Sequence, residues 1–487
     1  MYILLLHLYL FLGGAFVYAS PSSYDRRRAT NVVTCLESHQ VPYSMAGSSN
    51  WAALIKPFNL RLAYIPAVVT IPTTPDQVSS SVTCATAASL RVQAKGGGHS
   101  YASYSTGGQN GSMVISMENF SNITVDQSTF IAKVGAGQRL GNVALALYAQ
   151  GQRALPHGTC PGVGIAGHAL HGGYGYDSRK WGLTLDHIVA LDVVLANGTQ
   201  IHTTSTSYPD IFFAMRGAGD SFAIATYFYL STVPAPSSTQ YFTADLSASL
   251  SSAATAANGF VTLQNYVITT TTLTPDLTFG LYIDSEGDFN IQGWCIACST
   301  TTTKSLLSDL LSGFKKTSPV IQNLDHDTFY AKSLVTRDVI PLSTKALTSY
   351  FTYILANQGA GPFFSIINLY GGPNSAINTP ASNSSAYSDR SALWVLQNYG
   401  YTSDNLPPYD GAITTIVDDI SSSITNVEGN GEYTAYLNYV DPGLSAATAA
   451  QLYYGAPTYD QLLGIKVEVD PGLLFWNPQS IGTTPAF

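Results

Sequence analysis

A glycine-rich stretch with a histidine at its edge is the first candidate for chemistry in this chain. GGGHSYAS, residues 96–103, follows a predicted strand, LRVQAK, and places His99 directly after three glycines. Consecutive glycines cost backbone entropy, so a folded protein keeps them where the chain turns tightly or approaches a ligand closely. Backbone amides in such a turn can bind anionic oxygens. The stretch matches neither the P-loop nor the spaced dinucleotide fingerprint, so a tight turn remains the plainer interpretation of this loop alone.

The N-terminus predicts export. MYILLLHLYLFLGGAFVYAS is an apolar run that ends in small residues, and we expect residues 1–19 to be a cleaved signal peptide. No later stretch is apolar for long enough to cross a bilayer. The five N-x-Ser/Thr sequons suit the secretory route, although a Ser/Thr-rich chain contains several by chance. They begin at Asn110, Asn119, Asn122, Asn197 and Asn383.

An odd cysteine count in an exported protein needs an explanation. Cys35 and Cys84 flank the early region, and Cys295 and Cys298 form CIAC, which leaves Cys160 over. Cys160 is either a buried free thiol or a thiol consumed by another covalent bond. CIAC lacks the fold pattern of a thioredoxin-like redox pair, so we expect a small structural disulfide there.

Cys160 lies in a second glycine-dense run, LPHGTCPGVGIAGHALHGG, residues 155–173. His168 and His171 in this run are three residues apart, as some metal ligands are. No carboxylate or thiol set accompanies them and the glycines disfavour a helix, so we predict no metal site.

Composition limits the possible partners. Only 10% of the 487 residues are charged and the formal net charge is −9, which argues against a groove that follows nucleic-acid phosphates. A neutral small molecule, rich in hydroxyls or apolar, fits this composition better.

The elements that must position these loops predict an α+β protein. Residues 64–103 predict a strand, a helix after Pro75 with Asp76 as its cap, a second strand and the glycine loop. Residues 183–232 predict strands with a hairpin at Asn197-Gly198. Composition changes at PAPSST, residues 234–239, and residues 240–430 predict an antiparallel sheet with covering helices. We therefore expect domains at 20–236 and 237–430, with a C-terminal segment, 431–487, that returns to the first.

Four separated motifs in order resemble one family. Besides residues 96–103, these are the run at 155–199, YPDIFFAMRGAGDSFAIAT at 208–226 and LGIKVEVDPGLLFWNPQSI at 463–481. Together they resemble the berberine-bridge-enzyme-like group of the vanillyl-alcohol oxidase superfamily, and within it the fungal secreted gluco-oligosaccharide and chito-oligosaccharide oxidases. The resemblance implies an FAD-binding PCMH-type fold of two α/β subdomains, joined to an antiparallel substrate domain.

The resemblance also implies how a flavin is held. In the family the histidine of the first loop attaches to the 8α methyl of FAD and the cysteine of the second to carbon 6, which here are His99 and Cys160. Cys35 and Cys84 match a disulfide of relatives. The other positions expected to contact the cofactor are Gly96, Gly97, Gly98, Ser100, Gly164, Gly167, Ile224 and Asn438.

Catalytic and substrate positions follow from the same resemblance. Tyr439 matches the tyrosine that acts as base, although a free phenol has a pKa of about 10 and its anion would need local stabilisation. Asn368 falls where oligosaccharide oxidases have an aspartate bonded to that tyrosine, and an amide cannot accept its proton. Tyr101 and Gln397 match substrate-contacting residues, and Val163 matches a position where valine leaves room for oxygen.

The hypothesis from the sequence is a secreted, monomeric flavoprotein that oxidises the anomeric carbon of a reducing sugar to a lactone and reduces oxygen to hydrogen peroxide. One alternative is the same scaffold acting on a secondary metabolite. A second is a flavin-free binding or allergen-like protein. We expect neither nucleic acid nor membrane as a partner, and the sequence does not indicate which sugar or oligomer length is used.

Overall fold

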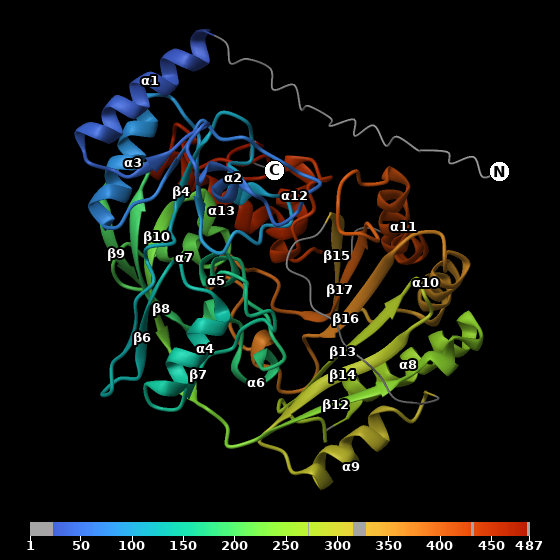
Figure 1. Ribbon diagram of the computed structural model, residues 1–487. Coiled ribbons are helices and arrows are strands. Elements are labelled where there is room, and N and C mark those ends of the chain that lie inside the picture. Colours follow the sequence, from blue (N-terminus) through green and yellow to red (C-terminus); the bar gives the residue numbers. More distant parts are fainter. Residues whose placement is uncertain (1–22, 271, 315–327, 430–432, 485–487) are drawn as a thin grey trace, which may run out of the picture.

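The computed structural model describes residues 23–270, 272–314, 328–429 and 433–484. The predicted signal peptide, residues 1–19, lies outside these residues. Three larger sheets with covering helices form two main hydrophobic cores among the described residues, which is the α+β architecture expected from the sequence (Figure 1). No helix among the described residues has the length and apolar character needed to cross a membrane.

The first sheet carries the first glycine loop. It has the order β1-β2-β4-β3, with β1 (Tyr43–Ser44), β2 (Val68–Thr70), β3 (Val92–Lys95) and β4 (Met113–Ser116), and β4 is parallel to both β2 and β3. Helix α3 (Pro75–Ala87) joins β2 to β3, and α1 (Ser23–Ser38) packs against it. The N-cap of α3 is Thr74, whose hydroxyl accepts from the Gln77 N–H at 3.3 Å. The prediction of Asp76 as cap was wrong, because Pro75 is the first helical residue and Asp76 already lies within the first turn.

The second sheet is antiparallel, and the second glycine-dense run, residues 155–173, precedes its strand β8 in the chain, separated from it by one short helix and a turn. Its order is β5-β6-β10-β8-β9, with β5 (Ile123–Val125), β6 (Ile131–Gly135), β8 (Ile188–Leu195), β9 (Gln200–Thr204) and β10 (Ala223–Ser231). The hairpin at Asn197-Gly198 joins β8 to β9 as predicted. Between these strands the chain forms the helices α4 (Leu140–Ala149), α5 (Ile165–Leu170), α6 (Ser178–Trp181) and α7 (Pro209–Ala218). The short helix α2 (Trp51–Ile55) lies earlier in the chain, between β1 and β2. The two-residue strands β7 (Arg153–Ala154) and β11 (Val233–Pro234) pair beside this sheet.

The third sheet is antiparallel throughout and has two different faces. Its order is β12-β14-β13-β16-β17-β15, with β12 (Thr239–Asp245), β13 (Leu277–Asp284), β14 (Phe289–Ile296), β15 (Phe329–Arg337), β16 (Phe363–Leu369) and β17 (Ala392–Tyr401). One face packs its apolar side chains against α8 (Ala253–Thr269), α10 (Thr344–Ala356) and α11 (Gly411–Glu428), which lie on the outer side of the sheet in Figure 1. Directly opposite residues of antiparallel strands share a face. The register Gln397–Ile366 and Asn368–Gly280–Gln292 therefore places these polar residues together on the other face.

The C-terminal segment returns to the first core. Helices α12 (Ala446–Tyr453) and α13 (Gly455–Val469) pack with it, and the chain after α13 pairs with the free edge of β3. The Val92 N–H donates to the Leu474 carbonyl at 2.8 Å, and Val92 forms a parallel bridge with Phe475. The strand that leads into GGGHS is thus paired on both edges.

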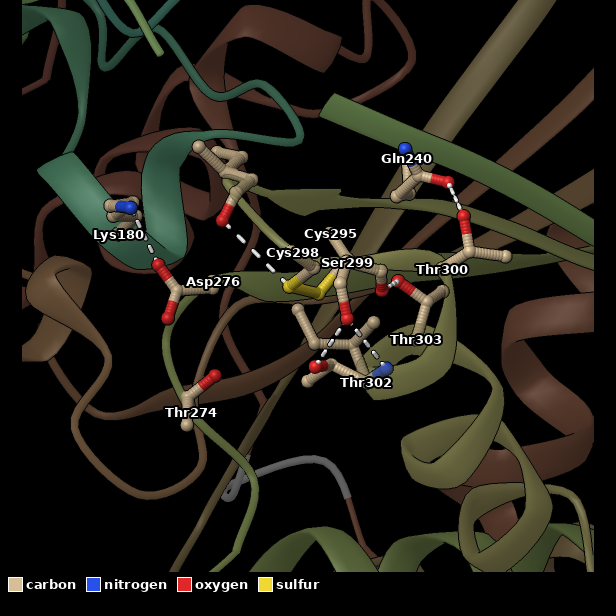
Figure 2. Close-up of a disulfide and its surroundings, with 12 residues drawn as sticks. Lys180, Gln240, Thr274, Asp276, Cys295, Cys298, Ser299, Thr300, Thr302 and Thr303 are labelled. Atoms are coloured by element: carbon tan, nitrogen blue, oxygen red, sulfur yellow. Dashed lines mark hydrogen bonds and ion pairs between the residues drawn. A yellow bond between two sulfur atoms is a disulfide. The ribbon is translucent and has the colours of Figure 1, made fainter. Parts of the chain in front are cut away.

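Four of the five cysteines form disulfides. Cys35–Cys84 ties α1 to α3, as the resemblance implied, and Cys295–Cys298 closes the short connection between β14 and α9 (Thr300–Leu310). Figure 2 shows the second bond just before Ser299, whose side chain caps α9 by accepting from the Thr302 N–H at 3.1 Å. Cys160 is free and exposed.

Candidate active site

The two glycine loops meet backbone to backbone. The first follows β3 and the second precedes α5, whose N-cap is Gly164. A Cβ on Gly97 would overlap the backbone of Gly164, and a Cβ on Gly164 would overlap the backbone of Gly97. A Cβ on Gly96 would lie 3.1 Å from the Ala136 carbonyl. Only glycine permits this approach, which answers why the sequence keeps glycine at both places.

His99 and Cys160 border this contact between the loops. The His99 ring stacks on Phe58 with centroids 4.3 Å apart, and its Nε2 lies 3.3 Å from where a Gly162 Cβ would be. Cys160 begins the same turn, because the Val163 N–H donates to its carbonyl at 3.3 Å. An imidazole and a free, exposed thiol therefore belong to the two loops that meet at these glycines.

Tyr439 lies in a short 3-10 turn, Leu437–Tyr439, of the returning C-terminal segment. Its ring stacks on Tyr101 at 5.9 Å and meets the edge of Tyr436 at 5.1 Å. Burial raises the pKa of Tyr439 well above its ordinary value, and the neighbouring phenols Tyr101 and Tyr436 raise it further. The protein around Tyr439 alone therefore disfavours its ionised form.

The polar face of the third sheet contributes Gln397 and Asn368. The Gln397 side-chain amide donates to the Tyr101 hydroxyl at 2.8 Å, so the two predicted substrate residues are in direct contact. Asn368 lies elsewhere on this face: its Oδ1 would be 2.5 Å from a Cβ on Gly280, which would also lie 3.4 Å from the Tyr176 hydroxyl. The described hydrogen bonds do not join Asn368 to Tyr439.

The remaining predicted positions lie around the loops. The Ser100 hydroxyl accepts from the Tyr104 N–H at 3.0 Å and so orders the turn after His99. Gly98 has a φ of +79°, and a Cβ on Gly167 in α5 would meet no atom within 4 Å. Ile224 is buried in β10. The Val163 carbonyl accepts from the Leu140 N–H at 2.9 Å, which holds α4 against the second loop.

His168 and His171 point to different partners and do not converge. The His168 Nε2 accepts from the Gly158 N–H at 3.1 Å, and burial lowers its pKa to about 3. The His171 Nε2 lies 3.1 Å from Asp220. Neither ring faces the other, so each belongs to the local fold.

Sequence reasoning missed an aromatic wall and a partly buried lysine. Phe329, on β15, meets Tyr101 edge-on at 5.0 Å and stacks on Tyr399 at 4.4 Å. Phe58, which stacks on His99, lies outside every motif and no local pattern marks it. Lys95 could have been found, because it directly precedes the three glycines; its ammonium donates to the Leu54 carbonyl at 2.7 Å, and burial lowers its pKa.

These residues fit an FAD. The glycines carry no side chains where the two loops meet, and the imidazole of His99 and the free, exposed thiol of Cys160 are the donor types that bind a flavin covalently. Residues 66–204 match the FAD binding domain family, and residues 435–482 match the berberine and berberine-like family. Fold and site together define an FAD-dependent oxidase.

Comparisons over the whole chain agree with this class of enzyme. The chain is 33% identical to a xylooligosaccharide oxidase of Thermothelomyces thermophilus, over 96% of this chain and 97% of that one. It is 32% identical to a chitooligosaccharide oxidase of Gibberella zeae, over 94% of this chain and 95% of that one. The protein belongs to the berberine-bridge-enzyme-like family of FAD-linked oxidases.

Solved structures show the same fold. A xylooligosaccharide oxidase from Myceliophthora thermophila in complex with xylobiose superposes with a TM-score of 0.87 at 31% identity, covering 94% of this chain and all of that one. A glucooligosaccharide oxidase from Acremonium strictum, with 6-S-cysteinyl, 8α-N1-histidyl FAD, superposes with a TM-score of 0.86 at 29% identity, covering 94% of this chain and all of that one.

Proposed function

We propose that this enzyme oxidises the C1 hydroxyl of reducing mono- or oligosaccharides to lactones and passes the electrons to oxygen, which gives hydrogen peroxide. The observation that carries the proposal is the contact of Tyr101 with both Gln397 and Tyr439. It brings the two residues proposed to bind the sugar next to the tyrosine proposed as base. A tyrosine offers a sugar both a flat apolar face and a hydroxyl. Relatives that act on xylo-, chito- and glucooligosaccharides support the same substrate class.

His99 and Cys160 are proposed as the two covalent anchors of FAD. Their positions in the two glycine loops, which meet backbone to backbone, support this, as does the bicovalent flavin of the glucooligosaccharide oxidase. Peptide mass mapping after acid denaturation tests it: we expect one flavin joined to the two peptides that contain these residues. Unmodified peptides from yellow, active protein would contradict it.

The residues of the chain would then divide the work as follows. FAD supplies the acceptor for the hydride that leaves C1. Tyr101 and Gln397 hold the sugar, and Tyr439 takes the O1 proton, which is general base catalysis. Val163, in the turn after Cys160, is proposed to leave room for oxygen. Asn368 is proposed to face the substrate from the sheet, and Asn438 and the glycines to line the cofactor.

We further propose that the protein is exported and acts as a monomer outside the cell, without nucleic-acid or membrane partners. The apolar N-terminal run and the sequons support export; every sequon asparagine is exposed. We also propose domain limits at 20–236, 237–430 and 431–487. The division between the two cores near residue 240 supports them.

A panel of mono- and oligosaccharides, scored for peroxide and for aldonic acid, tests the substrate class. We expect turnover of at least one reducing sugar and none of its C1-reduced alditol. Turnover of the alditol at the same rate, or of no sugar at all, would contradict the proposal.

A second candidate is oxidation of a smaller, non-sugar metabolite. Asn368 favours it, since an amide stands where the sugar oxidases are expected to have a carboxylate. A 34% identical FAD-linked oxidoreductase of Metarhizium anisopliae is as similar to this chain as the sugar oxidases are. A silent sugar panel with intact bound flavin would favour this second function.

A further inference from the structure

The hydroxyl oxygen of Tyr436 lies in an unusual hydrogen-bonding environment. The side chain is buried, 3% exposed, and three N–H groups donate to its oxygen: those of Gly173 at 2.9 Å, Tyr174 at 3.1 Å and the Asn438 side chain at 2.9 Å. A side-chain hydrogen bond with the Tyr370 hydroxyl also acts on this oxygen, and it lowers the pKa of Tyr436 as a donor does. A phenol both donates and accepts, whereas a phenolate only accepts. The partners of this oxygen are therefore those that a phenolate needs.

The backbone at HGGYG, residues 171–175, is shaped to make this site. Gly172 and Gly173 have φ values of +132° and +89°, which L-residues with side chains rarely adopt. A Cβ on Gly172 would lie 2.8 Å from the Tyr436 oxygen and 2.7 Å from its ring. The turn can therefore press against Tyr436 only with glycine at this position. Successive backbone N–H groups that converge in such a turn form an anion-binding nest.

Asn438 completes the nest from the other side. Its side-chain amide also donates to the His168 carbonyl at 3.1 Å, so it bridges the second glycine run and Tyr436. It lies directly before Tyr439 in the sequence, which ties the nest to the tyrosine proposed as base. Tyr436 and Tyr439 meet at 5.1 Å with their rings at 87°.

The two tyrosines differ in what surrounds them. Burial raises the pKa of both above the ordinary value. The N–H donors of Asn438, Tyr174 and Gly173, together with the Tyr370 hydroxyl, offset part of this rise for Tyr436, whereas neighbouring phenols raise the pKa of Tyr439 further. The other titratable rings that contact Tyr436 are Tyr370 at 5.9 Å and Tyr387 at 6.2 Å. Both are neutral phenols, since burial raises their pKa as well. Of the pair, Tyr436 therefore ionises more readily.

We propose that this nest makes Tyr436 the phenol of the pair that takes up negative charge more readily, and that Tyr439 passes the substrate proton on to it. The source of that proton rests on the proposed function. The O1 proton moves to the Tyr439 oxygen while the Tyr439 proton moves to the Tyr436 oxygen, which becomes neutral. The C1 hydrogen leaves with its electron pair to FAD, and the C1–O1 bond becomes a carbonyl. Tyr436 acts through Tyr439 and is thus a positioning and proton-holding residue.

NMR titration of the holoenzyme, labelled at the tyrosine Cζ carbon, tests where the charge lies. The signals are assigned by their loss in Tyr436→Phe and Tyr439→Phe. We expect the Tyr436 signal to move to its phenolate position at a lower pH than the Tyr439 signal. Ionisation of Tyr439 first would overturn the proposal. This measurement needs no substrate, so failure of the sugar proposal does not affect it.

Kinetics with three variants test the relay. Asn438→Ala removes one donor, so the rising limb of kcat/KM against pH should move to higher pH, together with the Tyr436 NMR signal. Tyr387→Phe, which changes a ring beside Tyr436 outside the nest, should leave both unchanged. Tyr436→Phe should lower kcat about 100-fold or more. Flavin retained after denaturation checks that each variant is loaded.

Asn438→Ala could instead lose activity while the rising limb of kcat/KM against pH and the Tyr436 NMR signal both stay in place. That result would assign Asn438 a purely structural role and refute the relay. If Tyr436→Phe does not fold, the Asn438→Ala and Tyr387→Phe comparison still decides.

Discussion

At the scale of single residues, the position of Tyr101 depends on a small number of directional contacts. Its ring lies between Tyr439 and Phe329, and its hydroxyl accepts from Gln397, whose side chain comes from the other domain. Gln397 is 6% exposed, so water replaces its hydrogen bond poorly. The geometry of the proposed sugar site therefore depends strongly on this amide.

We expect Gln397→Leu to raise KM for a sugar substrate by about 10-fold with a smaller change in kcat, because a lost buried hydrogen bond costs about 1–2 kcal/mol and acts on binding. Steady-state kinetics measure it. Gln240→Leu is the matched control, since Gln240 lies on the edge strand β12 and its side chain accepts from the Thr300 hydroxyl at 3.1 Å. Equal effects of the two substitutions would show that Gln397 does not act at the site.

Asp177 makes stability depend on pH in an unusual direction. Burial raises its pKa to about 7, and its Oδ1 accepts from the His157 N–H at 3.3 Å. The folded state thus binds a proton more tightly than the unfolded state, where the pKa is near 3.8. Its contribution to stability is complete below about pH 4 and is lost as pH rises through 7.

Asp177→Asn should remove this dependence. We expect the Tm of the wild type to fall relative to the variant between pH 5 and about 8. His168, whose pKa is depressed to about 3, changes stability in the opposite sense, losing its contribution as pH falls below 6.5. It is present in both proteins, so it cancels in the difference. Thermal unfolding across this range measures the effect, and parallel curves would refute it.

At the scale of elements, the contact between β3 and α5 through two glycines sets the position of both proposed anchors. We expect Gly97→Ala to push the loops apart, because its Cβ would overlap the Gly164 backbone, which cannot yield as a flexible side chain can. Covalent flavin per protein, read from absorbance after denaturation, should fall severalfold.

Gly464→Ala provides the control for this substitution. Gly464 lies within α13 and a Cβ there meets no atom within 4 Å, so the change should stabilise the protein slightly, by up to about 1 kcal/mol. Full flavin content in Gly97→Ala would show that the close approach of the loops is not needed.

The sequence predicted the elements that local chemistry determines. Glycines at 96–98, the Asn197-Gly198 hairpin and the helix after Pro75 each follow from backbone preferences of a few residues. Phe58 stacks on a histidine 41 positions away, and the pairing of β3 with residues near Phe475 spans most of the chain. Such contacts leave no local pattern, because they arise only when separate elements pack together. The nest around Tyr436 is partly predictable. The glycines that form it can be recognised in HGGYG, whereas no local pattern shows that Tyr436 binds there.

At the scale of the whole molecule, the active site lies between two cores, so their relative placement is part of the chemistry. Core residues from 32 to 230 belong to the first, those from 242 to 369 mostly to the second, and the C-terminal segment returns to the first. Arg179, on α6 of the first part, is fully buried and donates to carbonyls of the second. Its partners are Gly371 at 3.0 Å, Pro373 at 3.2 Å, Thr274 at 3.3 Å and Leu277.

Arg179 should therefore be the strongest single connection between the two parts. Its pKa, lowered by burial to about 10, leaves it charged at neutral pH. Arg179→Met would leave the buried carbonyls of Gly371 and Leu277 without this donor, each at a cost of about 1–3 kcal/mol, and would also remove the contacts with Thr274 and Pro373. We therefore expect a loss of about 3 kcal/mol or more in the free energy of unfolding. The adjacent Lys180, paired with Asp276 at 2.5 Å but partly exposed, is the control (Figure 2). Lys180→Ala should cost less than about 1 kcal/mol.

Calorimetry measures both, and we expect the Arg179→Met transition to split in two as the cores unfold separately. A single transition with an unchanged midpoint would mean that Arg179 is not needed to hold the cores together.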